Sequence, residues 1–187
     1  MNRDEKESTC QRLAIIGAGS IGCNFALVFS TAGHTVRLCE VDAETRNRAL
    51  ERIAISIGDL REFGLCIADP DEILSRISVT SDLGQAVGDA AYVQECVPEN
   101  PQLKRKVFRE LELLAPVSAV LASSSSAILA SNIAAGLETA ERCLVAHPGN
   151  PPSLIRVVEV VPAPFTSAKS VDRACTILRS AGMATVD

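Results

Sequence analysis

Three glycines at positions 17, 19 and 22 constrain this chain more than any other feature of its sequence. The apolar run Leu13–Ile16 comes directly before them, and Asn24–Phe29, which has helical periodicity, follows. A tight turn between a strand and a helix places the backbone N–H groups of the helix N-terminus around one point, where a pyrophosphate can bind. The segment therefore predicts a dinucleotide-binding turn.

Each glycine has a separate role in such a turn. Gly17 permits the sharp change of direction, Gly19 lets the ligand approach the backbone without a Cβ in the way, and Gly22 lets the helix pack closely on the strand. Ser20 and Ile21 stand between them, at the start of the predicted helix. We include both among the expected cofactor contacts.

An acid follows at the expected distance from the turn. The second predicted strand, Thr35–Cys39, ends at Glu40, 18 residues after Gly22. In dinucleotide-binding domains an acid about 20 residues beyond the turn binds the ribose hydroxyls of NAD and repels the extra phosphate of NADP. Glu40 therefore predicts NAD as the cofactor and disfavours NADP or a flavin. The alternative is an ordinary solvated loop acid.

Composition limits the classes of protein to consider. A chain of 187 residues is long enough for one domain with a substantial core, and its 47% hydrophobic residues form no run long enough to cross a bilayer. Residues 1–11 are polar, which predicts a short disordered leader without a secretory signal and a cytoplasmic protein. A net charge of −5, one tyrosine and no tryptophan argue against a nucleic-acid partner. We expect no membrane partner either.

The cysteines and one of the two histidines indicate no metal or redox chemistry. Seven cysteines show neither a C-x-x-C pair nor a metal-binding spacing, so we expect reduced, mostly buried side chains and no metal site. His34 lies in a predicted turn between a helix and a strand, where a structural or solvated role is expected.

Apolar segments alternate with helical stretches along the chain. This alternation is typical of an α/β protein with a doubly wound, mostly parallel sheet. The predicted strands cover residues 13–16, 35–39, 77–80, 90–97, 119–122, 143–146 and 155–161. The predicted helices follow Gly22 and cover 43–64, 69–73, 101–114 and 167–181, with a short helix after the turn at 123–126.

A histidine and a carboxylate occupy unusual places near the end of the chain. Glu159 stands amid four valines in a strand-like run, where burial without a partner would cost roughly several kcal/mol. His147, after the strand 143–146, is the candidate partner if this strand pairs with the strand 155–161 across the proline-rich loop 148–154. The alternatives are a purely structural pair, or a Glu159 on the solvent face of an edge strand.

Five blocks of sequence, taken in order, give the chain a family resemblance. They are Gly17–Gly22, Gln94–Asn100 with Leu103–Phe108, Ser123–Ser126, His147–Pro152 and Val158–Pro162. From about Arg12 to Ala181 the chain resembles the NAD-binding domain of the 3-hydroxyacyl-CoA dehydrogenase family. The doubled proline after Asn150 is most similar to the lambda-crystallin (L-gulonate 3-dehydrogenase) branch. The resemblance implies a Rossmann-type domain over residues 12–187.

This resemblance also implies roles for individual residues. It places the catalytic base at His147, which takes the proton of a hydroxyl group, and an orienting acid at Glu159. Ser126 falls on a position that contacts substrate and nicotinamide, and Asn150 on one at the nicotinamide ribose. For Ser126 the alternative is a turn or N-cap hydroxyl.

Three further positions follow from the same resemblance. Glu99 and Lys104 match cofactor-contacting positions, although Lys104 could instead be a solvated lysine on a helix face. Gly149 stands where relatives carry a bulkier residue, which predicts a larger or looser loop beside the histidine.

The family's Rossmann domain is followed by an all-helical domain that supplies a substrate-binding asparagine and most of the dimer interface. The chain stops at Asp187, before such a domain, so we expect it to bind NAD with little dehydrogenase activity of its own. The implied function is NAD-dependent oxidation of a 3-hydroxyacyl-CoA or related 3-hydroxy acid by a homo-oligomer. The alternative is a non-catalytic dinucleotide-binding module.

Overall fold

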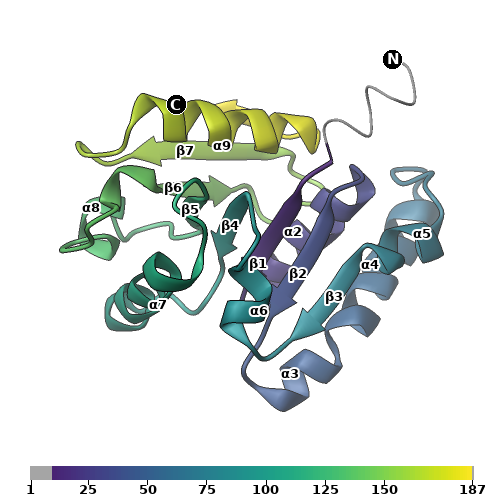
Figure 1. Ribbon diagram of the computed structural model, residues 1–187. Coiled ribbons are helices and arrows are strands. Elements are labelled where there is room, and N and C mark those ends of the chain that lie inside the picture. The colour runs from purple at the N-terminus through teal and green to yellow at the C-terminus, as the bar shows by residue number, and fades with distance from the viewer. Residues whose placement is uncertain (1–9, 187) are drawn as a thin grey trace.

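Strands at the centre of the molecule form one sheet in the computed structural model, which describes residues 10–186 (Figure 1). Over that range the sheet has eight strands in the order β3-β2-β1-β4-β5-β6-β7-β8. Their bounds are β1 Arg12–Ile16, β2 Thr35–Cys39, β3 Ile77–Thr80, β4 Tyr92–Glu95, β5 Val120–Ser123, β6 Cys143–Pro148, β7 Val157–Pro162 and β8 Ala184–Val186. The first six run parallel, whereas β7 is antiparallel to β6 and β8 is parallel to β7.

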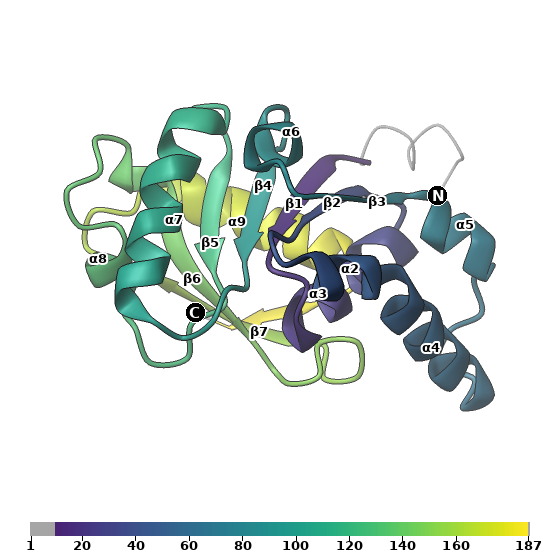
Figure 2. The ribbon, with the colours of Figure 1, turned by 90° about the horizontal axis from the view of Figure 1, so that it is seen from below.

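Helices cover both faces of this sheet (Figure 2). They are α2 Ser20–Thr31, α3 Ala43–Asn47, α4 Ala49–Glu62, α5 Pro70–Ser75, α6 Leu83–Val87, α7 Pro101–Leu114, α8 Ala130–Ile133 and α9 Ala168–Ser180, with a 3-10 turn at Ala140–Arg142. The mostly parallel, doubly wound α/β fold expected from the alternation of segments is confirmed.

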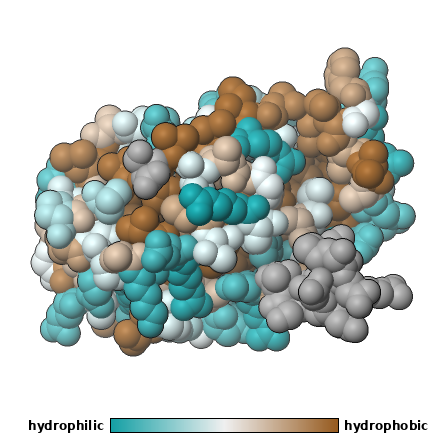
Figure 3. All heavy atoms as spheres, turned by 90° about the horizontal axis from the view of Figure 1, so that it is seen from above, coloured by the Kyte–Doolittle hydropathy of each residue, from teal (hydrophilic) through white to brown (hydrophobic). Residues whose placement is uncertain are grey.

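The period-two pattern of β1 divides the core into two layers. Leu13 and Ile15 belong to one cluster of buried residues, which α2, α4 and α9 cover, whereas Ala14 and Ile16 belong to a second, covered by α7 and α8. Successive side chains of a strand point to opposite faces, so a strand buried on both sides is apolar throughout. Figure 3 shows the outer surface from above, where apolar patches lie among polar side chains.

Helix α7 illustrates how the local sequence sets an element. Asn100 accepts a hydrogen bond from the backbone N–H of Leu103 and so caps the helix, and Pro101 occupies its first turn. The buried residues Lys104, Phe108 and Leu111 recur at helical spacing on the face toward the sheet. The predicted bounds 101–114 are confirmed.

The long helix predicted over residues 43–64 is wrong in one respect. The chain forms α3 and α4 as separate helices, with Arg48 between them. Helix α3 buries no residue, while the buried stripe of α4 begins at Ala49 and continues through Ile53 and Ile57. The second helix is therefore positioned by its own packing against α2 and α5 rather than as an extension of the first.

Gln11, the last residue of the predicted leader, is hydrogen-bonded to the body of the domain. Residues 1–9 of that predicted segment lie outside the described range, but Gln11 donates its backbone N–H to Nδ1 of His34 at 3.2 Å, and its carbonyl accepts from the N–H of Thr35. Nε2 of His34 lies 3.0 Å from Oγ of Ser180, which confirms a structural role for this histidine. Five of the seven cysteines are buried, as expected. None of the helices within residues 10–186 has the length and hydropathy needed to span a membrane.

Candidate functional site

The turn after β1 cannot accommodate side chains at two of its glycines. Gly17 has φ of +101°, and a Cβ there would lie 2.8 Å from the carbonyl oxygen of Cys96. A Cβ at Gly22 would lie 1.9 Å from the carbonyl oxygen of Gly17 itself. The turn is thus packed against the residues that follow β4 on one side and against the start of its own helix on the other. This agrees with the roles predicted for both residues.

Gly19 differs because the space around it is open. It is the N-cap residue of α2, where no side chain caps the helix and no acid stands in the first turn. A Cβ at Gly19 would meet no atom within 4 Å, and both Gly19 and Ser20 are exposed. A helix N-terminus with uncapped N–H groups and free space in front of it fits a pyrophosphate.

Glu40 is fixed against this turn. It lies half-buried at the end of β2, where Oε2 accepts from the N–H of Ala18 at 2.9 Å and Oε1 from the N–H of Asp42 at 3.0 Å. Because two backbone groups hold it, the carboxylate is not an ordinary solvated loop acid. It stands beside the open helix terminus, where the ribose of a bound dinucleotide is expected.

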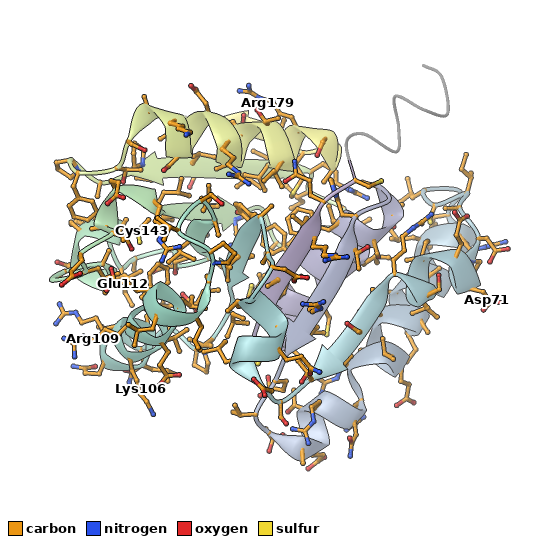
Figure 4. All side chains as sticks on the ribbon, viewed as in Figure 1. Asp71, Lys106, Arg109, Glu112, Cys143 and Arg179 are labelled. Atoms are coloured by element: carbon orange, nitrogen blue, oxygen red, sulfur yellow. The ribbon has the colours of Figure 1, made fainter. Side chains whose placement is uncertain are left out.

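A buried ion pair lies at the end of β4. Lys104 is 1% exposed, and its Nζ donates to both carboxylate oxygens of Glu95, at 2.8 and 3.0 Å, and to the carbonyl of Val97 at 3.1 Å. The alternative of a solvated lysine is therefore wrong for Lys104. Figure 4 shows Lys106 and Arg109, by contrast, extending from α7 away from the body of the protein.

Sequence reasoning missed Glu95. It is fully buried and accepts additionally from Oγ of Ser123 and from the N–H of Val97. Burial raises the pKa of its carboxyl, while the ammonium of Lys104 and these donors act against that rise. The available signal was an acid inside an apolar strand, nine positions before a lysine on the buried face of the next helix.

Glu99 links this ion pair to the loop that carries Ser124, Ser125 and Ser126 after β5, called here the serine loop. Its Oε2 lies 3.5 Å from Nζ of Lys104, and its Oε1 accepts from the N–H groups of Ser126 and Ala127 at 3.1 and 3.2 Å. Burial tends to raise the pKa of Glu99, but the hydrogen bonds from Ser125 and Ala127 and the charge of Lys104 outweigh it and lower the pKa. The loop is thereby held with Ser126 exposed at the surface.

A second buried polar residue, Gln94, was also missed. Its Nε2 donates to Oγ of Ser124 at 2.8 Å and to the carbonyl of Ala146 at 3.2 Å. Gln94 therefore joins β4 to the serine loop and to the residue that precedes His147. A fully buried amide must make its hydrogen bonds inside the protein. Here the partners of Gln94 are Ser124, just after β5, and Ala146 on β6, next to the candidate site residues.

His147 and Glu159 face each other across the antiparallel pair β6 and β7. The sheet register places the two residues directly opposite, and Nδ1 of His147 lies 3.0 Å from Oε2 of Glu159. The expected pairing of the two strands across the proline-rich loop is confirmed. Strand β7 is not the edge of the sheet, because β8 pairs with it on the other side.

The premise that Glu159 is buried among valines is wrong. Val158 and Val160 point into the core, whereas the side chain of Glu159 is 61% exposed and that of His147 is 35% exposed. The alternation of the strand puts the carboxylate on the open face together with the imidazole. The desolvation argument for a partner of Glu159 therefore does not apply. The reason to place the pair in the site is that the sheet register sets the two residues opposite each other.

The contact also determines what the imidazole can do. A carboxylate only accepts hydrogen bonds, so beside Glu159 the neutral ring carries its proton on Nδ1. Nε2 then has a free lone pair that can accept a proton, and the carboxylate stabilises the imidazolium that results. An imidazole held in this way can serve as a general base and, once protonated, as a general acid.

The loop that follows is closed rather than enlarged at Gly149. A Cβ there would lie 2.2 Å from Cγ2 of Ile155, and the N–H of Gly149 donates to the carbonyl of Val157. The expectation of a larger or looser loop is thus wrong, because Ile155 fills the space that a side chain at Gly149 would need. Asn150 follows on the exposed side of the loop.

These groups gather at one edge of the sheet. The glycine turn, Glu40, Glu99, the serine loop and His147 all lie at the carboxyl ends of parallel strands, and the strand order reverses direction between β1 and β4. Ligands of open α/β sheets bind at such a position. Within the described range, no group of three or more His, Cys, Asp or Glu side chains could hold a metal ion.

Comparison with known proteins agrees with this geometry. The family described as 3-hydroxyacyl-CoA dehydrogenase, NAD binding domain, matches residues 12–187. A lambda-crystallin homolog from Bos taurus is 41% identical over 93% of this chain and 55% of its own length. An L-carnitine dehydrogenase from Streptomyces griseus is 34% identical over 94% of this chain and 52% of its own length. The chain therefore spans about half the length of these relatives.

The fold has counterparts among solved structures. The 3-hydroxybutyryl-CoA dehydrogenase of Escherichia coli K12 superposes with a TM-score of 0.88 and 30% identity, over 95% of this chain and 38% of the other.

Proposed function

The chain belongs to the 3-hydroxyacyl-CoA dehydrogenase family, whose NAD-binding domain matches residues 12–187, and from this premise we propose that its His147–Glu159 pair serves as the general base in the NAD-dependent oxidation of a 3-hydroxyacyl group. The proposed substrate is a 3-hydroxy acid or its CoA thioester. The observation that carries the proposal is the cross-strand contact of 3.0 Å, which leaves one ring nitrogen available at the carboxyl edge of the sheet.

In such a reaction His147 transfers the proton and Glu159 stabilises the protonated ring. When bound, NAD supplies the acceptor for the hydride that leaves the carbinol carbon. His147 takes the hydroxyl proton at Nε2, so the C–O bond gains double-bond character as the C–H bond breaks. The carboxylate of Glu159 accepts the hydrogen bond from Nδ1–H and stabilises the positive ring. In the reverse direction the same imidazolium returns the proton.

The remaining contacts orient the reactants. We assign the cofactor pyrophosphate to the N–H groups at Gly19, Ser20 and Ile21, and the adenosine ribose to Glu40. The serine loop presents Ser126 to the substrate, and the carboxylate of Glu99 holds that loop in place. Proton transfer requires close approach, so these contacts serve to place the hydroxyl group within hydrogen-bond reach of His147.

The names of the relatives support the choice of substrate class. Carnitine and 3-hydroxybutyryl-CoA, which appear in the names of two of them, share a hydroxyl group on the third carbon of an acyl chain. The resemblance of the sequence to the lambda-crystallin (L-gulonate 3-dehydrogenase) branch adds L-gulonate to the candidates. A hydroxyl in this position is common to all three molecules, whereas their remaining groups differ.

A panel assay tests the proposal. NADH formation is measured with 3-hydroxybutyryl-CoA, L-carnitine and L-gulonate, and with lactate as a 2-hydroxy control, in the full-length protein that carries this sequence. We expect oxidation of at least one 3-hydroxy substrate, none of lactate, and loss of the activity in His147→Gln. NADH binding without oxidation of any substrate would instead support a non-catalytic dinucleotide-binding module. Activity that survives in His147→Gln would overturn the proposed role of the pair.

A further inference from the structure

One side-chain contact joins the loop between β6 and β7 to helix α2. Oγ of Ser153 donates to Oδ1 of Asn24 at 2.5 Å, across a separation of 129 residues in the chain. Ser153 is 9% exposed and Asn24 is half-buried, so the contact is partly shielded from water. Figure 2 shows this loop beside the beginning of α2.

The amide of Asn24 extends the contact into the first turn of α2. Its Nδ2 donates to the carbonyl of Ser20 at 2.9 Å, so both ends of one planar group are engaged. Ser20 is the first residue of the helix, next to the open space at Gly19. The side chain of Asn24 therefore connects the helix terminus to the loop by two hydrogen bonds.

A displacement of Ser153 would carry the rest of the loop with it, because hydrogen bonds hold the backbone of the loop together. The N–H groups of Leu154 and Ile155 both donate to the carbonyl of Pro151, and that of Gly149 donates to the carbonyl of Val157. The guanidinium of Arg156 donates to the carbonyl of Ser153 at 3.1 Å. A shift of Ser153 would therefore move the whole segment, including Asn150 and the residues next to His147.

We propose that Asn24 and Ser153 are positioning residues, which together fix the loop bearing Asn150 relative to the helix terminus that receives the cofactor. The inference rests on the proposed function, in which His147 and the cofactor act on the same substrate. Atoms that react must be held to within a fraction of an ångström, and a hydrogen-bonded link between the two sites supplies such a constraint. Neither residue touches the reacting atoms, and their effect passes through the loop.

A double-mutant cycle on NADH binding tests the link. Kd is measured by fluorescence titration for the wild type, Asn24→Ala, Ser153→Ala and the double variant. We expect each single change to weaken binding by ~5-fold, a size that one neutral hydrogen bond can produce, and the double change to weaken it no further. Ser153→Thr keeps the hydroxyl group and is expected to restore wild-type affinity. Ser75→Ala, which removes an exposed hydroxyl bonded only within α5, is the matched control.

Hydrogen exchange of the cofactor-free protein gives a second readout. Asn24→Ala lies on α2, yet we expect it to speed exchange of the N–H groups of Gly149 and Ile155 in the loop between β6 and β7, which is far from Asn24 in the sequence. The N–H of Ala115, bonded to Leu111 at the end of α7, is expected to stay unchanged. Faster exchange confined to α2 would overturn the link.

The outcomes separate this inference from the proposed function. Equal NADH affinities in all four proteins, or losses that multiply in the double variant, would overturn the positioning role even if His147 proves essential for turnover. Conversely, a non-multiplying loss of affinity supports the link whether or not a 3-hydroxy substrate is found.

Discussion

Oε2 of Glu40 accepts a hydrogen bond from the backbone N–H of Ala18 at 2.9 Å, which fastens the acid at the end of β2 to the glycine turn at the end of β1. The bond sets the carboxylate beside the uncapped terminus of α2. Because the position of Glu40 is fixed by the backbone, a phosphate on the adenosine ribose would meet a negative charge that has little freedom to move away.

Glu40 should therefore decide the choice between the two nicotinamide cofactors. We expect the protein to bind NADH at least ~10-fold more tightly than NADPH, which corresponds to about 1.4 kcal/mol, and Glu40→Ala to narrow that ratio. Fluorescence titration with both cofactors measures it, with the exposed acid Glu44→Ala as the control. Equal affinities in the wild type would contradict the assignment.

His147 and Glu159 should act as one unit. We expect His147→Ala and Glu159→Gln each to lower turnover by ~10²-fold or more, and the double change to cost less than the product of the two, because the acid works through the base. Steady-state rates of the four proteins on the substrate identified in the panel assay provide the test. Losses that multiply would show that the two side chains act independently.

Gly149 should not tolerate a side chain. A Cβ would lie 2.2 Å from Cγ2 and 2.9 Å from Cβ of Ile155, so Gly149→Ala is expected to lower the free energy of unfolding by ~1–3 kcal/mol. Urea denaturation measures the change. Adding Ile155→Ala should recover part of the loss. Gly58→Ala, in a helix position where a Cβ meets no atom within 4 Å, is expected to be neutral or stabilising.

Removing one charge of the buried pair of Glu95 and Lys104 should lower the free energy of unfolding more than removing both charges does. Lys104→Met leaves a buried carboxylate without its cation, and we expect a loss of ~3–5 kcal/mol in the free energy of unfolding. Replacing both charges, in Glu95→Leu with Lys104→Met, should cost less than that single change. Lys106→Met, on the exposed side of the same helix, is the control. A double variant less stable than Lys104→Met would refute this account.

His34 should make the protein less stable in mild acid. Burial lowers the pKa of its imidazole below the ordinary value of 6.5, and Nδ1 accepts from the N–H of Gln11, so the folded state favours the neutral ring. The unfolded chain binds the proton more readily, and the stabilisation present above pH 6.5 is lost as the pH falls toward the folded-state pKa. Thermal unfolding from pH 8 to 5 should show a steeper decline for the wild type than for His34→Gln. Parallel curves would contradict the prediction.

Local signals in the sequence were sufficient for several elements. The cap at Asn100 and the proline at 101 fixed the start of α7, and Asp69 before Pro70 likewise marked α5. The predictions missed α6 and β8, which are short. Each has few residues to show a period, and they form because neighbouring elements offer a surface or an unpaired strand.

The sequence predicted those site residues that follow one another at a known spacing. It predicted less well those whose position depends on packing between segments far apart in the sequence. The glycine turn and Glu40 follow one another in a known spacing, and both lie where that spacing places them. Glu95 and Gln94 gave no comparable signal, because their partners come from other strands and from α7. The exposure of Glu159 likewise depends on which face of β7 turns outward, and a run of valines does not reveal that face.

The span of the contact between Asn24 and Ser153 bears on how the protein acquires its cofactor site during refolding. A bond across 129 residues closes a very long loop, so it forms only after most of the chain has found its place. The glycine turn and Glu40, by contrast, are 18 residues apart and can assemble early. Dinucleotide affinity should therefore rise in two stages along a refolding time course, a weak stage with the first strands and a final stage when the proline-rich loop docks.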